Sequence, residues 1–189
     1  MHWADYTAQR LMERGGKQVS ASGITPSGEF HIGHLREILS AEMIHRACLD
    51  AGMSSKYIFI VDSMDPLRRV YDFLSPEYEE FIGCPLAYIP APEEDGSPGD
   101  GSVTYANHFL SPFLEALEQI GVRPEVVMNH ETYEKGLFAE YIDSAITNRE
   151  EIRRIIQQIS GRELPSDWFP YNPRSEEHTS ELQSPCNLV

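Results

Sequence analysis

The chain has 189 residues, 15 basic and 30 acidic, so its formal net charge is −15. Hydrophobic residues make up 41% of it, a share that supports a folded core and excludes wholesale disorder. The acidity excludes a protein whose whole surface binds nucleic acid, although a local basic patch remains compatible with it. Apolar runs are too short for a membrane span, and the first residues do not form a signal peptide, so we expect a cytoplasmic protein.

The cysteines and the last residues bear on domain organisation. Cys48, Cys84 and Cys186 lie far apart, a spacing that indicates neither a disulfide framework nor a metal site. Residues 174–189 show no helical or alternating period, and residues 174–184 resemble one reading frame of a sequencing adapter. We therefore expect residues 1–173 to be the native part of a chain that is cut short, and residues 174–189 to be a non-native, disordered tail.

The apolar periodicity predicts alternating helices and strands along the chain. Helices are expected over residues 3–14, 31–51, 75–81 and 105–120, with two more helical stretches between 137 and 159. Strands are expected over residues 18–22, 57–61 and 125–128, the second of them covered on both faces because it is continuously apolar. Residues 90–101 form a loop in this interpretation. The order predicts an α/β, Rossmann-like fold: a parallel sheet with helices on both faces.

The first strand-to-helix turn carries the chemistry. Residues 22–34 read Ser-Gly-Ile-Thr-Pro-Ser-Gly-Glu-Phe-His-Ile-Gly-His, at a place where parallel sheets collect anionic ligands. His31 and His34 share one helix face and lean toward the helix start. Gly33 between them lets a flat ring or a phosphate approach the backbone. The pattern predicts a nucleoside triphosphate site, although two histidines at this spacing also occur at solvated helix starts.

Residues 21–37 resemble the signature of class I lysyl-tRNA synthetases. His-x-Gly-His alone would indicate only the wider nucleotidyl-transferring group, but further segments resemble the same family in order over residues 1–173. These segments are 2–5, 61–70, 102–109, 161–162 and 168–170.

The resemblance implies a lysine–tRNA ligase, which activates lysine with ATP and Mg²⁺ and transfers the lysyl group to tRNA(Lys). Residues 1–173 would be the truncated N-terminal part of its Rossmann-type catalytic domain. His31 and His34 would be the catalytic residues, binding the phosphates and stabilising the developing charge. Gly23 and Thr25 would line the lysine pocket. The expected ATP-binding residues are Thr25, Pro26, Ser27, Gly28, His31, Gly33 and His34.

Two carboxylates after the second expected strand have open roles. Asp62 and Asp65 could contact ribose, the substrate ammonium or the pair Arg68 and Arg69, and they could equally be a solvated strand end.

The chain departs from the family before Tyr105. Some members carry a metal site there, built from Asp, Cys and two His, and the matching positions here are Ala91, Gly101, Ser102 and His108. Because only His108 remains as a ligand type, we expect no zinc.

Two other functions stay open. The family continues beyond residue 173 into a Cys-rich segment, the rest of the lysine pocket, a Lys-Met-Ser-Lys-Ser-type loop and an anticodon-binding domain, so we expect this fragment to be incomplete for activity. One alternative is another His-x-Gly-His nucleotidyltransferase, such as a phosphopantetheine adenylyltransferase, although those lack the Gly-Ile-Thr-Pro-Ser lead-in. The other is a non-catalytic synthetase-like module that binds tRNA or a partner.

Overall fold

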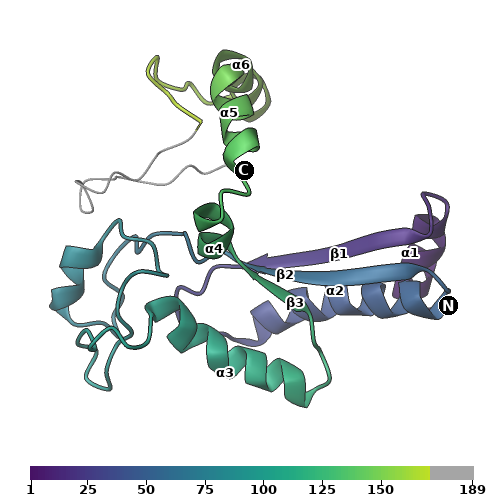
Figure 1. The fold of residues 1–189 in the computed structure, drawn as a ribbon, viewed down its shortest axis with the longest axis horizontal. Helices are drawn as coiled ribbons and strands as arrows, with labels where there is room; N and C mark the ends of the chain where they lie inside the picture. Colours follow the sequence, from purple (N-terminus) through teal and green to yellow (C-terminus); the bar gives the residue numbers. More distant parts are fainter. Residues whose placement is uncertain (171–189) are drawn as a thin grey trace.

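The computed structural model describes residues 1–170, which form a parallel three-stranded sheet with helices (Figure 1). The strands are β1 (Lys17–Ile24), β2 (Ser54–Val61) and β3 (Glu125–Met128). The helices are α1 (Trp3–Met12), α2 (Ile32–Asp50), the 3-10 helix η1 (Pro76–Phe81), α3 (Tyr105–Gln119), α4 (Asn129–Glu134), α5 (Ala139–Thr147) and α6 (Arg149–Ser160). The predicted α/β class and each predicted helix and strand are confirmed, whereas α4 was not predicted. The expectation for residues 174–189 lies outside the described residues.

The sheet brings the carboxyl ends of its strands to one edge. The strand order is β1-β2-β3, and both neighbouring pairs are parallel. Ile24 at the end of β1 pairs with Val61 at the end of β2, which in turn pairs with Met128 at the end of β3. The segments that follow the three strands therefore start side by side, and ligands of open parallel sheets bind beyond such an edge.

Helices α2 and α3 pack on the same face of the sheet. Ile38 from α2 and Phe113 from α3 join Phe59 and Val61 of β2 in one buried cluster. Alternate residues of β2 point to this face because side chains in a strand alternate. A buried hydrogen bond between the hydroxyls of Ser22 and Tyr57, 2.8 Å, ties β1 to β2 beneath the helices.

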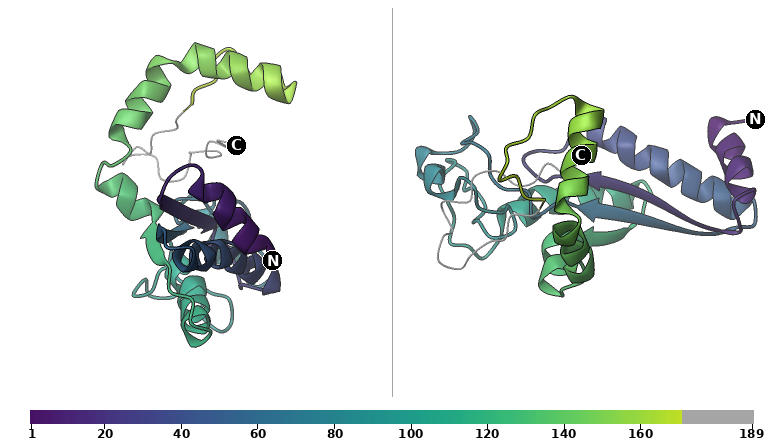
Figure 2. Two further views of the ribbon diagram at one scale, coloured as in Figure 1. Left: turned by 90° about the vertical axis from the view of Figure 1, so that its right-hand side faces the viewer. Right: turned by 90° about the horizontal axis from the view of Figure 1, so that it is seen from above.

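The opposite face of the sheet is only partly covered in the described residues. Val19 is 64% exposed and Ile60 37% exposed on this face, where Lys56 and Glu125 also form an ion pair of 2.6 Å. Helices α4 to α6 leave on this side but project away from the sheet (Figures 1 and 2). The packed helices thus cover one face, and the expectation that β2 is covered on both faces is wrong for this part of the chain.

Two smaller clusters flank the sheet. The segment between β2 and α3 folds around the fully buried Tyr78 and Tyr105. At the far end, α1 packs on α2 through Ala8 and Cys48. Cys48 is buried, and Cys84 is half-buried. Among residues 1–170, no helix is both long and apolar enough to cross a bilayer.

Candidate active site

The turn after β1 is held in place by burial and by short-range hydrogen bonding. Pro26 is among the fully buried side chains, and the Ser27 N–H donates to the Thr25 carbonyl at 2.9 Å. Gly28 faces Phe73, whose ring would lie 3.7 Å from a Cβ added at the glycine. The four predicted ATP-binding residues from Thr25 to Gly28 therefore lie in a well-packed turn that leads into α2.

His31 and His34 cap the start of α2 with their own side chains. The Gly33 N–H donates to His31 Nδ1 at 3.0 Å, and the His31 N–H donates to His34 Nδ1, also at 3.0 Å. Each Nδ1 is therefore an acceptor, so in each neutral ring Nε2 carries the hydrogen. Both imidazoles thus present an Nε2–H donor, and the two ring centroids lie only 4.1 Å apart. Two adjacent N–H donors at a helix N-terminus suit a phosphate.

His34 is biased toward its neutral form. Partial burial lowers the pKa of the His34 imidazole below its ordinary value of 6.5, and the neighbouring His31 lowers it further. Phe30 contributes to this burial through an edge-on ring contact with centroids 5.1 Å apart. A neutral His34 keeps Nδ1 available as an acceptor for the helix cap, which protonation would abolish.

Gly33 has a second reason to be glycine besides ligand access. A Cβ at this position would lie 2.7 Å from Cε1 and 3.0 Å from Nδ1 of His31. The first distance is shorter than real Cβ contacts allow, so any side chain at Gly33 would displace the His31 ring. The glycine therefore protects the cap that orients His31.

Gly23 and Thr25, the positions expected to line the lysine pocket, lie beside the strand edge. Gly23 is exposed on the face opposite α2, and a Cβ there would lie an ordinary 3.5 Å from the Ile60 carbonyl. The missing side chain thus leaves open surface rather than relieving a clash. Thr25 directly follows β1 and is half-buried.

Asp62 and Asn129 form a pair where β2 and β3 end. The Asp62 N–H donates to the Ile24 carbonyl at 2.9 Å, which places this carboxylate next to Thr25. The Asn129 amide donates to Asp62 Oδ1 at 3.1 Å. Asn129 therefore fixes one oxygen of a half-buried carboxylate that has no ion pair within residues 1–170.

Ser63 and His130 form a second contact between the same two strand ends. The Ser63 hydroxyl is fully buried, lies 2.8 Å from His130 Nδ1 and accepts the His130 N–H at 3.1 Å. These bonds fix β3 and α4 against β2. Sequence reasoning missed Ser63, Asn129 and His130, although the last two directly follow a predicted strand, where the rule used for the first turn would have found them.

Asp65 has a different partner from Asp62. Arg68 Nη2 lies 2.9 and 3.2 Å from the two Asp65 carboxylate oxygens. Arg69 instead stands over the Tyr71 ring, 5.3 Å from its centroid. Of the roles left open for the two carboxylates, an ion pair with arginine thus applies to Asp65, whereas Asp62 accepts a hydrogen bond from Asn129.

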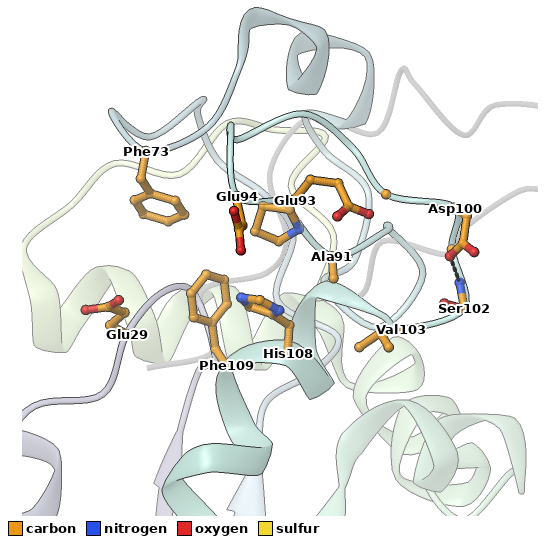
Figure 3. Close-up of a pocket in the computed structure, with 13 residues that line it drawn as sticks. Glu29, Phe73, Ala91, Glu93, Glu94, Asp100, Ser102, Val103, His108 and Phe109 are labelled. Atoms are coloured by element: carbon orange, nitrogen blue, oxygen red, sulfur yellow. Dashed lines mark hydrogen bonds between the residues drawn. The ribbon is translucent and has the colours of Figure 1, made fainter.

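A cavity of about 720 Å³ lies beside the turn. Figure 3 shows His108 and Phe109 at the start of α3, with Phe73 and Glu94 across from them and Glu29 at one end. The positions that match the family's metal site, Ala91, Gly101, Ser102 and His108, all line this cavity. Within residues 1–170, no three potential metal ligands are grouped, and the absence of zinc stays a prediction. The cavity's carboxylates make it a poor host for phosphates.

Comparison with known proteins decides the family. Residues 1–185 match the family described as tRNA synthetases class I (K). The chain belongs to this class I synthetase family. The lysine–tRNA ligase 1 of Methanosarcina acetivorans is 44% identical over 177 residues, which are 94% of this chain and 32% of the relative. The lysine–tRNA ligase of Archaeoglobus fulgidus is 45% identical over 176 residues, 93% of this chain and 34% of the relative.

The match bears out the resemblance seen in the sequence. A third relative, the lysine–tRNA ligase of Methanocaldococcus jannaschii, is 44% identical over 174 residues, 91% of this chain and 32% of its own length. The chain therefore spans about a third of the length of these curated synthetase relatives.

Proposed function

We propose that this chain supplies the phosphate-binding part of a lysine–tRNA ligase, which activates lysine with ATP and transfers it to tRNA(Lys) in the cytoplasm. The observation that carries the proposal is the double cap of α2, in which Nδ1 of both His31 and His34 accepts a backbone N–H and Nε2–H of each neutral ring remains as a donor. The family match over residues 1–185 favours this function over a standalone nucleotidyltransferase.

In the proposed reaction, the lysine carboxylate attacks the α-phosphorus of ATP. A bond forms between that carboxylate and phosphorus, and the bond to the bridging oxygen breaks, releasing pyrophosphate. His31 and His34 donate hydrogen bonds to phosphate oxygens as their charge grows, while the turn from Thr25 to Gly28 places the nucleotide. Mg²⁺ would enter bound to the phosphates of ATP, as part of the substrate, and share their charge.

The amino acid lies next to the turn in this proposal. Gly23 and Thr25 line its pocket, and Asp62, held by Asn129, accepts a hydrogen bond from the substrate ammonium. Asp65 and Arg68 neutralise each other at the rim and help to fix the segment after β2. A carboxylate without an ion pair among residues 1–170 suits an ammonium ligand, and Arg68 acts on Asp62 only through a longer-range charge interaction.

A chimeric enzyme tests the function. Residues 1–170 of this chain replace the matching third of the Methanosarcina acetivorans relative, and ATP–pyrophosphate exchange is measured with each amino acid. We expect exchange that depends on lysine. Exchange with a different amino acid, and none with lysine, would refute the proposal.

A further inference from the structure

Tyr105 connects a distant part of the chain to the phosphate-facing turn. It is the first residue of α3, it is fully buried, and its hydroxyl donates to the Ser27 carbonyl at 2.8 Å, across 78 positions of sequence. The surrounding segment 102–109 is one of those that resemble the synthetase family, but it has no role in the reaction proposed above. The hydrogen bond from Tyr105 to Ser27 suggests a role for it.

Helix α3 contacts the turn and its exit at two further places. Phe30, which immediately precedes His31, stacks on Phe113 with ring centroids 4.4 Å apart and planes 10° apart. Phe109 makes an edge-on contact with Phe73 at 5.7 Å, and Phe73 is the ring that faces Gly28. The turn is thus supported by α3 along its length, in addition to its covalent links to β1 and α2.

The bond from Tyr105 fixes the orientation of one peptide group. The carbonyl of Ser27 and the N–H of Gly28 belong to the same planar trans peptide and point in opposite directions. Because the carbonyl is turned to the buried Tyr105, the Gly28 N–H is turned away from that cluster. An amide oriented in this way is a ready donor for a phosphate oxygen.

We propose, on the basis of the function proposed above, that Tyr105 is a positioning residue of the ATP site. Its hydroxyl holds the Ser27 carbonyl and thereby presets the Gly28 N–H and the approach of the chain to His31. Nucleotide binding then depends on the fold of the segment between β2 and α3, which contributes Leu74 and Tyr78 to the cluster around Tyr105.

The chain contains a matched control. Tyr78 is also fully buried in the same cluster, and its hydroxyl donates to the carbonyl of Pro90 at 2.9 Å. Tyr105→Phe and Tyr78→Phe therefore remove equivalent buried bonds, and only the first touches the turn. A purely structural role predicts similar effects of both variants.

Amide hydrogen exchange on the 189-residue chain separates the two roles. The probes are the bonded amides of Ser27, His31 and Gly33. We expect Tyr105→Phe to speed their exchange roughly tenfold, since an unmade buried bond costs about that factor in opening equilibrium. Tyr78→Phe should leave them at the wild-type rate. Equal rates in the two variants at these amides would overturn the proposal.

The affinity for Mg-ATP gives the second readout. We expect the dissociation constant to rise roughly tenfold in Tyr105→Phe and to stay unchanged in Tyr78→Phe. If the wild-type chain binds no ATP but the exchange pattern holds, the positioning role stands and the proposed function loses support. If Tyr105→Phe does not fold, native-state amide hydrogen exchange of the wild-type chain in low urea tests the positioning role instead. The Ser27 amide and the first bonded amides of α3 should then open together, and separate openings would contradict the inference.

Discussion

At the start of α2, two imidazoles do what Ser, Thr or Asp does at most helix starts. The cost is that the cap depends on protonation, because a protonated Nδ1 cannot accept a hydrogen bond. The benefit is that each neutral ring keeps an Nε2–H donor at a place where the helix dipole already favours anions. In the proposed site, one nitrogen of each imidazole caps the helix and the other binds phosphate.

The pKa of His34 gives the first prediction. Burial and the neighbouring His31 lower this pKa below 6.5, so the unfolded chain binds more protons than the folded chain in the window just below that value. Stability therefore falls as the pH drops from 6.5 toward the folded pKa. An NMR titration should give His34 a midpoint below 6.5, and a midpoint above that value would contradict the cap geometry.

Gly33→Ala is expected to weaken ATP binding with little change in stability. The alanine gains about 1 kcal/mol of helix propensity, which offsets the roughly 1 kcal/mol lost when the His31 cap is displaced. Affinity falls because the His31 ring can no longer occupy its position. Calorimetric binding and thermal unfolding of the same sample measure both effects, and unchanged affinity would show that His31 tolerates the methyl group.

Asp62→Asn should raise the KM for lysine in the chimera. Hydrogen bonds to charged groups contribute about 1.5–3 kcal/mol, so the increase should be on the order of tenfold or more. Asp65→Asn is the control, because its partner is Arg68 and not the substrate. Similar KM values for the two variants would remove Asp62 from the amino-acid site.

At the scale of elements, α3 links the sheet to the turn. Phe113 packs on Phe59 in the main cluster and stacks on Phe30 beside the histidines. Phe113→Ala should lower the free energy of unfolding by about 3–5 kcal/mol, measured by urea unfolding of the chain. Ile159→Ala on α6 is the matched exposed site, 80% exposed, and should stay within ~0.5 kcal/mol of wild type. Equal losses would mean that Phe113 is not part of the core.

Local sequence patterns predicted the helices, the strands and the first turn, but not the contacts between them. Residues 23–34 contain Gly, Pro and His, which favour turns or can cap a helix, so the position of the turn could be predicted from the residue types alone. The start of α4 has no such signal, since Met128 at its N-cap offers no side-chain bond, and Asn129 and His130 went unnoticed. The bond from Tyr105 to Ser27 joins segments far apart in sequence, and no local period encodes it.

For the whole molecule, charge limits how tRNA can bind. The net charge of −15 opposes a polyanion. On helix α6, Arg149, Arg153 and Arg154 pair with Glu150 and Glu151 of the same helix. Within residues 1–170, these arginines therefore form no uncompensated basic patch for RNA. The chain spans about a third of its synthetase relatives.

The most direct test of the central claim is the rate of lysine-dependent ATP–pyrophosphate exchange in the chimera with and without His34→Ala. The double cap predicts that the substitution lowers kcat by about 10²–10³, the usual loss when one transition-state hydrogen-bond donor is removed, while the KM for lysine changes little. A His34→Ala enzyme with the parent's kcat would contradict the assignment of the phosphate site to α2.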